Sequence, residues 1–195
     1  MNLRNIFTLF ITVLAAYTIN GQSIVSTTPA NKNVILEELT GISCGYCPDG
    51  HLKAQQLSDA NSGRVVVVNI HTGSYANPQG AGSDFRTTWG DYVGNLFPVS
   101  GYPTGSINRR EFNGEVMNNR GSWIGHANTV LGEVSPVNVG ATANLDLGGR
   151  VATVNVEAYY TSTGTGSSNK IHVILLQDNI PGPQSGGASF NPTMI

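Results

Sequence analysis

Both cysteines of the chain lie in one short stretch, "GISCGYCPDGH", with two residues between Cys44 and Cys47. The nucleophile in thiol–disulfide exchange is a thiolate, and the start of an α-helix favours negative charge through its unpaired N–H groups and its dipole. The following residues, "CPDGHLKAQQLSD", predict a helix that places Cys44 at its N-terminus. We therefore expect Cys44, with a lowered pKa, to attack, and the less exposed Cys47, one turn later, to resolve the mixed disulfide.

Two other uses of this cysteine pair remain open. A zinc site needs four ligands, so His51, four residues after Cys47, and His71 would have to complete it. A static disulfide is the stronger alternative, although closing so small a ring removes little chain entropy. His71 and His126 have no partner visible in the sequence, and we interpret them as structural histidines.

The elements around the pair alternate between strand and helix. Residues 33–40 predict a strand covered on both faces, and residues 64–71 form a continuous β-branched run. A second helix is predicted over Phe85–Phe97, capped by Ser83 or Asp84 and ended by Pro98. A strand in "YPTGSINRREF", a turn at Asn113-Gly114 and a helix over residues 122–133 follow, and the inner side of that helix carries Trp123, Ala127, Val130 and Leu131.

After Pro136 the composition changes to alternating strand patterns. Strands are predicted over residues 137–145, 151–160 and 170–177, joined by Gly-rich turns, which indicates an antiparallel sheet or sandwich. Three strands are too few to close a sandwich. We therefore expect residues 135–195 to be the start of an incomplete β-rich domain that continues beyond Ile195.

The N-terminus has the pattern of an export signal. An apolar run of about twelve residues, Ile6–Tyr17, is too short to span a bilayer, so we predict a signal peptide over residues 1–21 and a linker over 22–33. An uncleaved membrane anchor is the alternative. No cysteine lies directly after the run, so we expect no lipid attachment at a lipobox thiol. Export to the periplasm, outer membrane or exterior implies conditions in which a disulfide persists.

Composition excludes one class of partner. The 195 residues carry a formal net charge of −2, and 11% of them are charged. Nothing in this composition forms the basic stripe that nucleic-acid binding needs. The hydrophobic content of 39% is enough for a packed core.

The order of elements over residues 34–134 resembles the thioredoxin fold, an α/β fold in which a CxxC precedes a helix and a cis-proline loop faces the thiols. "VSGYPTG" is similar to the Gly-x-Pro-Thr of that loop. The resemblance implies that Pro103 is cis and that the backbone of Tyr102, with Gly101 and Thr104, pairs with an extended substrate strand. "CGYC" also resembles the active-site tetrapeptide of periplasmic disulfide isomerases.

A narrower resemblance covers about residues 33 to 190. The stretches "VILEELTGISCGYCPDGH", "IHTGSY" and "DFRTTWGDYVGNLFPVSGYPTGSINR", together with the β-rich tail, are similar to the outer membrane protein 28 related family of exported bacterial proteins. This resemblance implies an association with the outer membrane. The missing lipobox cysteine departs from many members of the family.

Glu37 and Glu38 fall on opposite faces of the first predicted strand. Glu38, six residues before Cys44, matches the buried acidic position of thioredoxins, where it would relay protons for the second thiol. Burial and a nearby thiolate would raise the pKa of Glu38. A solvent-facing carboxylate is the alternative.

The sequence is compatible with two functions. In the first, Cys44, Cys47, Pro103 and Glu38 exchange disulfides with exported protein thiols or disulfides, using no cofactor beyond the cysteine pair and no metal. In the second, the chain is an outer-membrane or secreted binding protein with a static disulfide.

Overall fold

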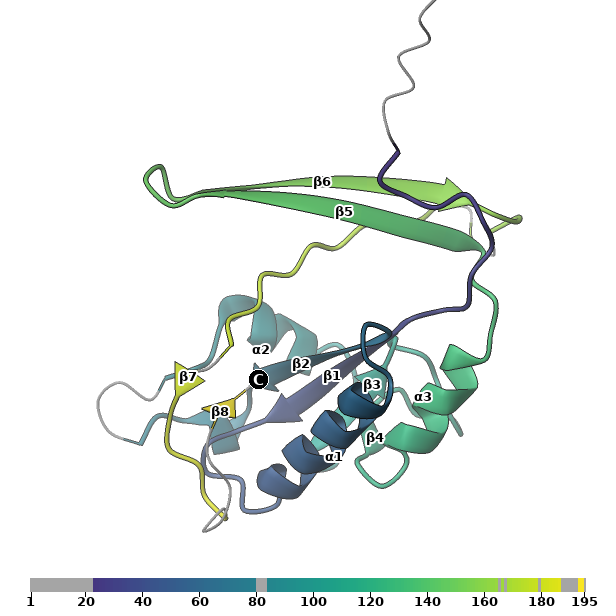
Figure 1. Cartoon of the computed structure of the whole chain (residues 1–195). Coiled ribbons are helices and arrows are strands. Elements are labelled where there is room, and N and C mark those ends of the chain that lie inside the picture. The colour runs from purple at the N-terminus through teal and green to yellow at the C-terminus, as the bar shows by residue number, and fades with distance from the viewer. Residues whose placement is uncertain are drawn as a thin grey trace, which may run out of the picture.

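The computed structural model describes residues 23–79, 84–164, 166, 168–178, 180–186 and 193–194. The first part of the chain alternates between strands and helices in the predicted order (Figure 1). Its elements are β1 (Val34–Thr40), α1 (Cys47–Ala60), β2 (Val65–His71), the short 3-10 helix η1 (Ser74–Ala76), α2 (Thr88–Gly94), β3 (Thr104–Ile107), β4 (Asn118–Asn119) and α3 (Trp123–Leu131).

One mixed sheet organises this α/β unit, and its strand order is β2-β1-β3-β4. β1 and β2 are parallel because α1 carries the chain back to the starting edge of the sheet, whereas β3 runs antiparallel to β1. β3 and β4 are joined by a loop whose tip is the predicted Asn113-Gly114 turn, where both residues have positive φ.

Helices cover both faces of the sheet, α1 and α3 one face and α2 the other (Figure 1). Alternate side chains of β1 and β2 therefore enter two separate cores. Beneath α1 and α3 lie Val34, Leu36, Ala54, Leu57, Val65, Val67, Ile107, Trp123, Ala127, Val130 and Leu131. Beneath α2 lie Leu39, Val68, Ile70, Val93 and Met117.

The helix predicted over Phe85–Phe97 is shorter than its apolar pattern suggested. Thr87, not Asp84, caps it, because the Thr87 hydroxyl accepts a hydrogen bond from the Gly90 N–H at 2.9 Å. The Asp84 carboxylate is instead engaged by the backbone and guanidinium of Arg86. The other predicted cap, Ser83, lies outside the described residues.

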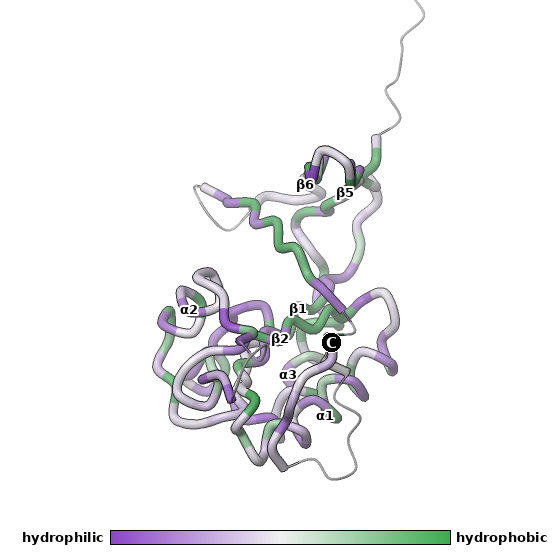
Figure 2. The backbone as a smooth tube through the Cα atoms, turned by 90° about the vertical axis from the view of Figure 1, so that its left-hand side faces the viewer, coloured by the Kyte–Doolittle hydropathy of each residue, from purple (hydrophilic) through white to green (hydrophobic). Residues whose placement is uncertain are grey.

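The second part of the chain begins with a long hairpin, β5 (Val137–Asp146) and β6 (Val151–Tyr160). The two strands pair along their whole length. Two short strands follow, β7 (Ile180–Pro181) and β8 (Thr193–Met194). Figure 2 shows the hairpin standing to one side of the α/β unit.

The strand predicted over residues 170–177 does not form. This segment joins neither edge of the hairpin, and without a partner ladder its alternating pattern cannot make a strand. Residues 174–177 instead line a cavity with β2 residues 67–71. The chain then continues along the α/β unit toward the CxxC loop (Figure 1).

Residues 23–33, predicted as a linker, contact both parts of the chain. The Glu157 carboxylate accepts hydrogen bonds from Ser23 and from the Ile24 N–H, and Lys32 forms an ion pair with Glu133. The predicted signal peptide lies outside the described residues. Within the described ranges, no helix has the length and apolar character to cross a bilayer.

Candidate functional site

Cys44 and Cys47 are joined by a disulfide bond in the loop that connects β1 to α1. α1 begins at Cys47 with Tyr46 as its N-cap, so Cys44 is not at the helix start as predicted, but in the preceding turn. In that turn the Cys44 N–H donates to the Gly41 carbonyl at 3.0 Å. The disulfide nevertheless holds the Cys44 sulfur beside the first residue of the helix.

Both cysteines are buried. Cys44 is 2% exposed and Cys47 is 0% exposed, so the predicted difference in exposure is small. Pro48 suits the first turn of α1, because a proline there sacrifices no helical hydrogen bond. The remaining residues of the motif, Gly45 and Tyr46, are exposed.

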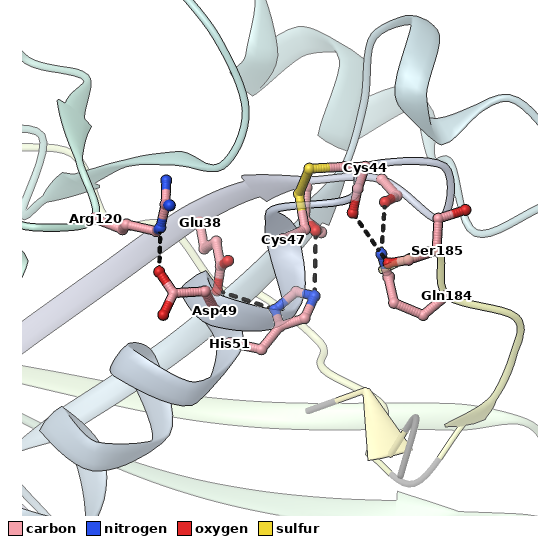
Figure 3. The surroundings of a disulfide bond; sticks show 10 residues. Glu38, Cys44, Cys47, Asp49, His51, Arg120, Gln184 and Ser185 are labelled. Atoms are coloured by element: carbon pink, nitrogen blue, oxygen red, sulfur yellow. Dashed lines mark hydrogen bonds and ion pairs between the residues drawn. A yellow bond between two sulfur atoms is a disulfide. The ribbon is translucent and has the colours of Figure 1, made fainter. Parts of the chain in front are cut away.

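A buried polar group lies beneath the first turns of α1 (Figure 3). Glu38 is fully buried, which excludes the solvent-facing alternative, and its Oε2 lies 3.2 Å from Nδ1 of His51. The other ring nitrogen of His51 lies 3.3 Å from the Thr40 hydroxyl. His51 sits one turn after Cys47 on α1, so this group connects β1 to the helix that carries the motif.

Burial raises the pKa of the Glu38 carboxyl, and the hydrogen bond and charge of His51 oppose that rise. The second oxygen of Glu38, Oε1, has no hydrogen-bond partner among the described residues. A Cβ placed on Gly50 would lie 2.6 Å from this oxygen and 2.7 Å from Cγ of Pro103. The absence of a side chain at Gly50 therefore lets α1, Glu38 and Pro103 approach one another.

The Tyr102–Pro103 peptide bond is cis, as the sequence predicted. Tyr102 is half-buried, and its ring meets that of Tyr75 edge-on, with the ring centroids 5.6 Å apart. Tyr102 also lines a cavity of about 660 Å³ together with residues 72–74, Asp91 and 94–99. This cavity lies next to the proline loop, and no pattern in the sequence indicated it.

The two other predicted substrate-binding residues differ from each other. Gly101 is exposed and has open space around its Cα. Thr104 is only 5% exposed, and its hydroxyl donates to the Asn118 carbonyl at 3.0 Å. The Thr104 hydroxyl is therefore used in the pairing of β3 with β4, and a role of Thr104 in substrate binding stays a prediction.

Arg120, which no sequence pattern indicated, contacts the exposed residues Tyr46 and Asp49 next to the disulfide. The Arg120 guanidinium lies over the Tyr46 ring, 5.5 Å from its centroid, and forms an ion pair with Asp49 (Figure 3). This ion pair holds the pKa of Asp49 below its usual value. Arg120 is far from the CxxC in the sequence, and only the tertiary structure brings this residue, which follows β4 directly, to Asp49 of α1.

The remaining predicted residues have structural contacts. Glu37 is buried on the opposite face of β1 from Glu38, as predicted, and it forms a two-pronged ion pair with Arg109. His126 stacks on Phe112, with ring centroids 4.0 Å apart. Burial lowers the pKa of His71 to about 4, with a smaller contribution from His51.

A zinc site has no support in the part of the chain that the structure describes. The disulfide uses both thiols, and no cluster of three or more His, Cys, Asp or Glu residues there could hold a metal ion.

A segment more than 130 residues away along the chain completes the site. The Gln184 side-chain amide donates to the carbonyls of Gly41 and Cys44, at 3.2 and 3.1 Å. The Ser185 N–H donates to the Ile42 carbonyl at 2.7 Å. Figure 3 shows both residues beside Cys44. No pattern in the sequence indicates this contact, because a segment rich in Gly, Pro and Ser predicts only a loop.

No family model matches the chain, and no curated protein matches it. Among solved structures, HBP35 of Porphyromonas gingivalis matches with a TM-score of 0.43 and 23% sequence identity. The match covers 59% of this chain and 38% of HBP35, so the chain spans well under half the length of that protein. The resemblance to the outer membrane protein 28 related family therefore stays a prediction.

Proposed function

We propose that this chain is an exported thioredoxin-like protein that exchanges disulfides with protein substrates through Cys44 and Cys47. The observation that supports this function most directly is the Cys44–Cys47 disulfide beside the start of α1, above the buried Glu38–His51 pair, with the cis-proline Pro103 against Gly50 of the same helix. The proposed site lies in the periplasm, at the outer membrane or outside the cell. That location depends on the apolar run at residues 6–17.

The chemistry is a pair of balanced exchange steps. In the oxidising direction, a substrate thiolate attacks the Cys44 sulfur, the Cys44–Cys47 bond breaks, and Cys47 leaves as a thiolate that takes up a proton. A second substrate thiolate then attacks the substrate sulfur of the mixed disulfide and releases reduced Cys44. In the reducing direction, the Cys44 thiolate attacks a substrate disulfide, and Cys47 resolves the mixed disulfide.

Glu38 is the proposed proton donor and acceptor for Cys47. Its carboxyl lies under the helix turn that begins at Cys47, and its raised pKa lets it hold a proton at higher pH than an exposed carboxyl does. His51 orients it through Oε2, which leaves Oε1 without a described partner on the side of Gly50 and Pro103. Tyr102, Gly101 and the adjacent cavity form the proposed substrate surface.

A Cys47→Ser variant tests whether the site turns over. Cys44 then keeps its nucleophile but loses its resolving partner, so incubation with a disulfide-linked peptide should accumulate a mixed disulfide, detected as a mass increase. Cys44→Ser is the matched control and should trap much less. If the Cys47→Ser variant, with its Cys44 thiol reduced and the reductant removed, carries no adduct after incubation with the disulfide-linked peptide, the exchange function is wrong.

A Glu38→Gln variant tests the proton relay separately. Glutamine keeps the shape and a hydrogen-bond acceptor but cannot exchange a proton, so we expect the reductive step to slow by roughly tenfold or more, in line with general acid–base effects. The measurement is the rate of peptide disulfide reduction against pH. An unchanged rate and pH profile would remove Glu38 from the mechanism without affecting the roles of the cysteines.

A static binding protein is the second candidate, because both sulfurs are buried and residues 184–186 lie against their loop. In that case the disulfide only fixes the β1–α1 connection, and neither cysteine variant exchanges with peptides.

A further inference from the structure

The loop around the disulfide presents a row of backbone acceptors to one side. The carbonyls of Gly41, Ile42 and Cys44 all accept hydrogen bonds from residues 184–185. Gln184 supplies its side-chain amide to two of them, and Ser185 supplies its backbone N–H to the third. We define these three carbonyls as the carbonyl edge.

The covering segment lies directly against the loop. Gly186 has a φ of +82°, and any Cβ at this position would overlap the Gly45 carbonyl. Only a residue without a side chain permits this approach. Together with the hydrogen bonds, the contact helps to explain why Cys44 is 2% exposed although Gly45 and Tyr46 beside it are exposed.

We propose that the carbonyl edge is a docking surface for a polypeptide turn that offers amide donors, and that residues 183–186 are its intramolecular occupant. Residues 185–186 form a turn, and the three carbonyls are satisfied by one side-chain amide and one backbone N–H, which together remove the cost of leaving buried backbone acceptors unpaired. The fitting partner offers amide donors and small residues, as "PQSG" does, whereas a carboxylate facing three carbonyls would be repelled.

Taken with the proposed function, on which this step depends, the partner is a turn-forming segment of the protein substrate that carries an amide side chain. The substrate and the chain's own segment then compete for the carbonyl edge beside Cys44. Exchange requires residues 183–186 to leave, so their hydrogen bonds set the fraction of molecules with an accessible disulfide.

The test measures access to the disulfide and needs no catalytic turnover. The oxidised full chain is treated with dithiothreitol, which becomes a cyclic disulfide as Cys44 and Cys47 each gain one electron and one proton. Alkylation and mass spectrometry follow the rate. A Gln184→Ala variant loses two hydrogen bonds to the edge, and we expect its reduction to be roughly three- to tenfold faster than that of the wild type. Gln56→Ala, an exposed residue of α1, is the matched control and should react at the wild-type rate.

A peptide added in trans tests the docking surface itself. Acetyl-IPGPQSG-amide, matching residues 180–186, should slow the reduction of the Gln184→Ala variant, and the same peptide with alanine in place of glutamine should slow it less. Equal reduction rates for Gln184→Ala, Gln56→Ala and wild type, or no effect of the peptide, would overturn the proposal. Neither result depends on mixed disulfides in Cys47→Ser, so this proposal and the exchange function can fail separately.

Discussion

The α/β unit and the β5–β6 hairpin both follow clear hydrophobic patterns, but only the α/β unit buries them. Leu36, Leu39 and Trp123 are fully buried between the sheet and its helices. In the hairpin region, Leu145 is 61% exposed and Leu147 is 85% exposed. An alternating pattern is therefore enough to pair two strands, whereas burial needs a second layer to pack against.

The α/β unit and the hairpin are also not packed tightly against each other. A groove of about 1230 Å³ separates them, lined on one side by β1 and residues 108–109 and on the other by residues 135–139, His172 and Ile174. The α/β unit therefore has its own cores, and its site does not depend on packing by the hairpin. The later chain instead reaches the site through residues 184–186.

The largest expected effect is at Trp123, which is fully buried and donates its indole N–H to the Asn118 carbonyl at 2.9 Å. Trp123→Ala should lower the free energy of unfolding by about 3–5 kcal/mol, because it leaves a cavity beneath α3. Leu147→Ala in the hairpin turn should change it by less than about 0.5 kcal/mol. Urea unfolding followed by circular dichroism measures both, and similar losses would mean that the hairpin is packed as the α/β unit is.

A smaller effect is expected from the pH dependence of stability at His71. Its folded pKa of about 4 lies below the usual histidine value of 6.5, so below pH 6.5 the unfolded chain binds a proton that the folded chain does not. Stability should therefore be lost as the pH falls from 6.5 toward 4, by up to about 3 kcal/mol from this group. His71→Gln should flatten this slope relative to wild type.

His172→Gln is the control for that measurement, because His172 is an exposed histidine of the second region. It should leave the slope of stability against pH unchanged. Glu38 acts in the opposite sense, since its raised pKa lowers stability as the pH rises above 4.5, so each variant is compared with wild type at the same pH. If stability falls as steeply with pH in His71→Gln as in the wild type, His71 is not the source of the pH dependence.

The contrast between packed and open surroundings can also be tested at two helical glycines. Gly50→Ala should destabilise the protein by about 1–3 kcal/mol, because its Cβ meets Glu38 and Pro103. Gly125→Ala in α3 has open space around it and should stabilise by up to about 1 kcal/mol through helix propensity. Thermal or urea unfolding distinguishes the two signs, and a stabilising Gly50→Ala would mean that α1 does not approach the proline loop so closely.

Short-range patterns predicted most of the α/β unit. The β-branched run gave β2, the 3.6-residue spacing of Trp123, Ala127 and Val130 gave α3, and Asn113-Gly114 gave a turn. The apolar pattern predicted the wrong start of α2, because a local contact of Asp84 competes with helix capping. Asp84 bonds to Arg86 instead of capping α2, and this helix begins at Thr88 instead of Phe85.

The sequence by itself determined the spacing of Cys44 and Cys47, the strand before them and the helix after them, because each depends on neighbours a few residues apart. The tertiary structure decided which distant groups reach this motif. His51 meets Glu38 only because α1 packs on β1, Arg120 meets Asp49 only because of the position of β4, and Gln184 meets the carbonyl edge only because the late chain returns to it. Such contacts depend on how the elements pack, and no local pattern of residues encodes them.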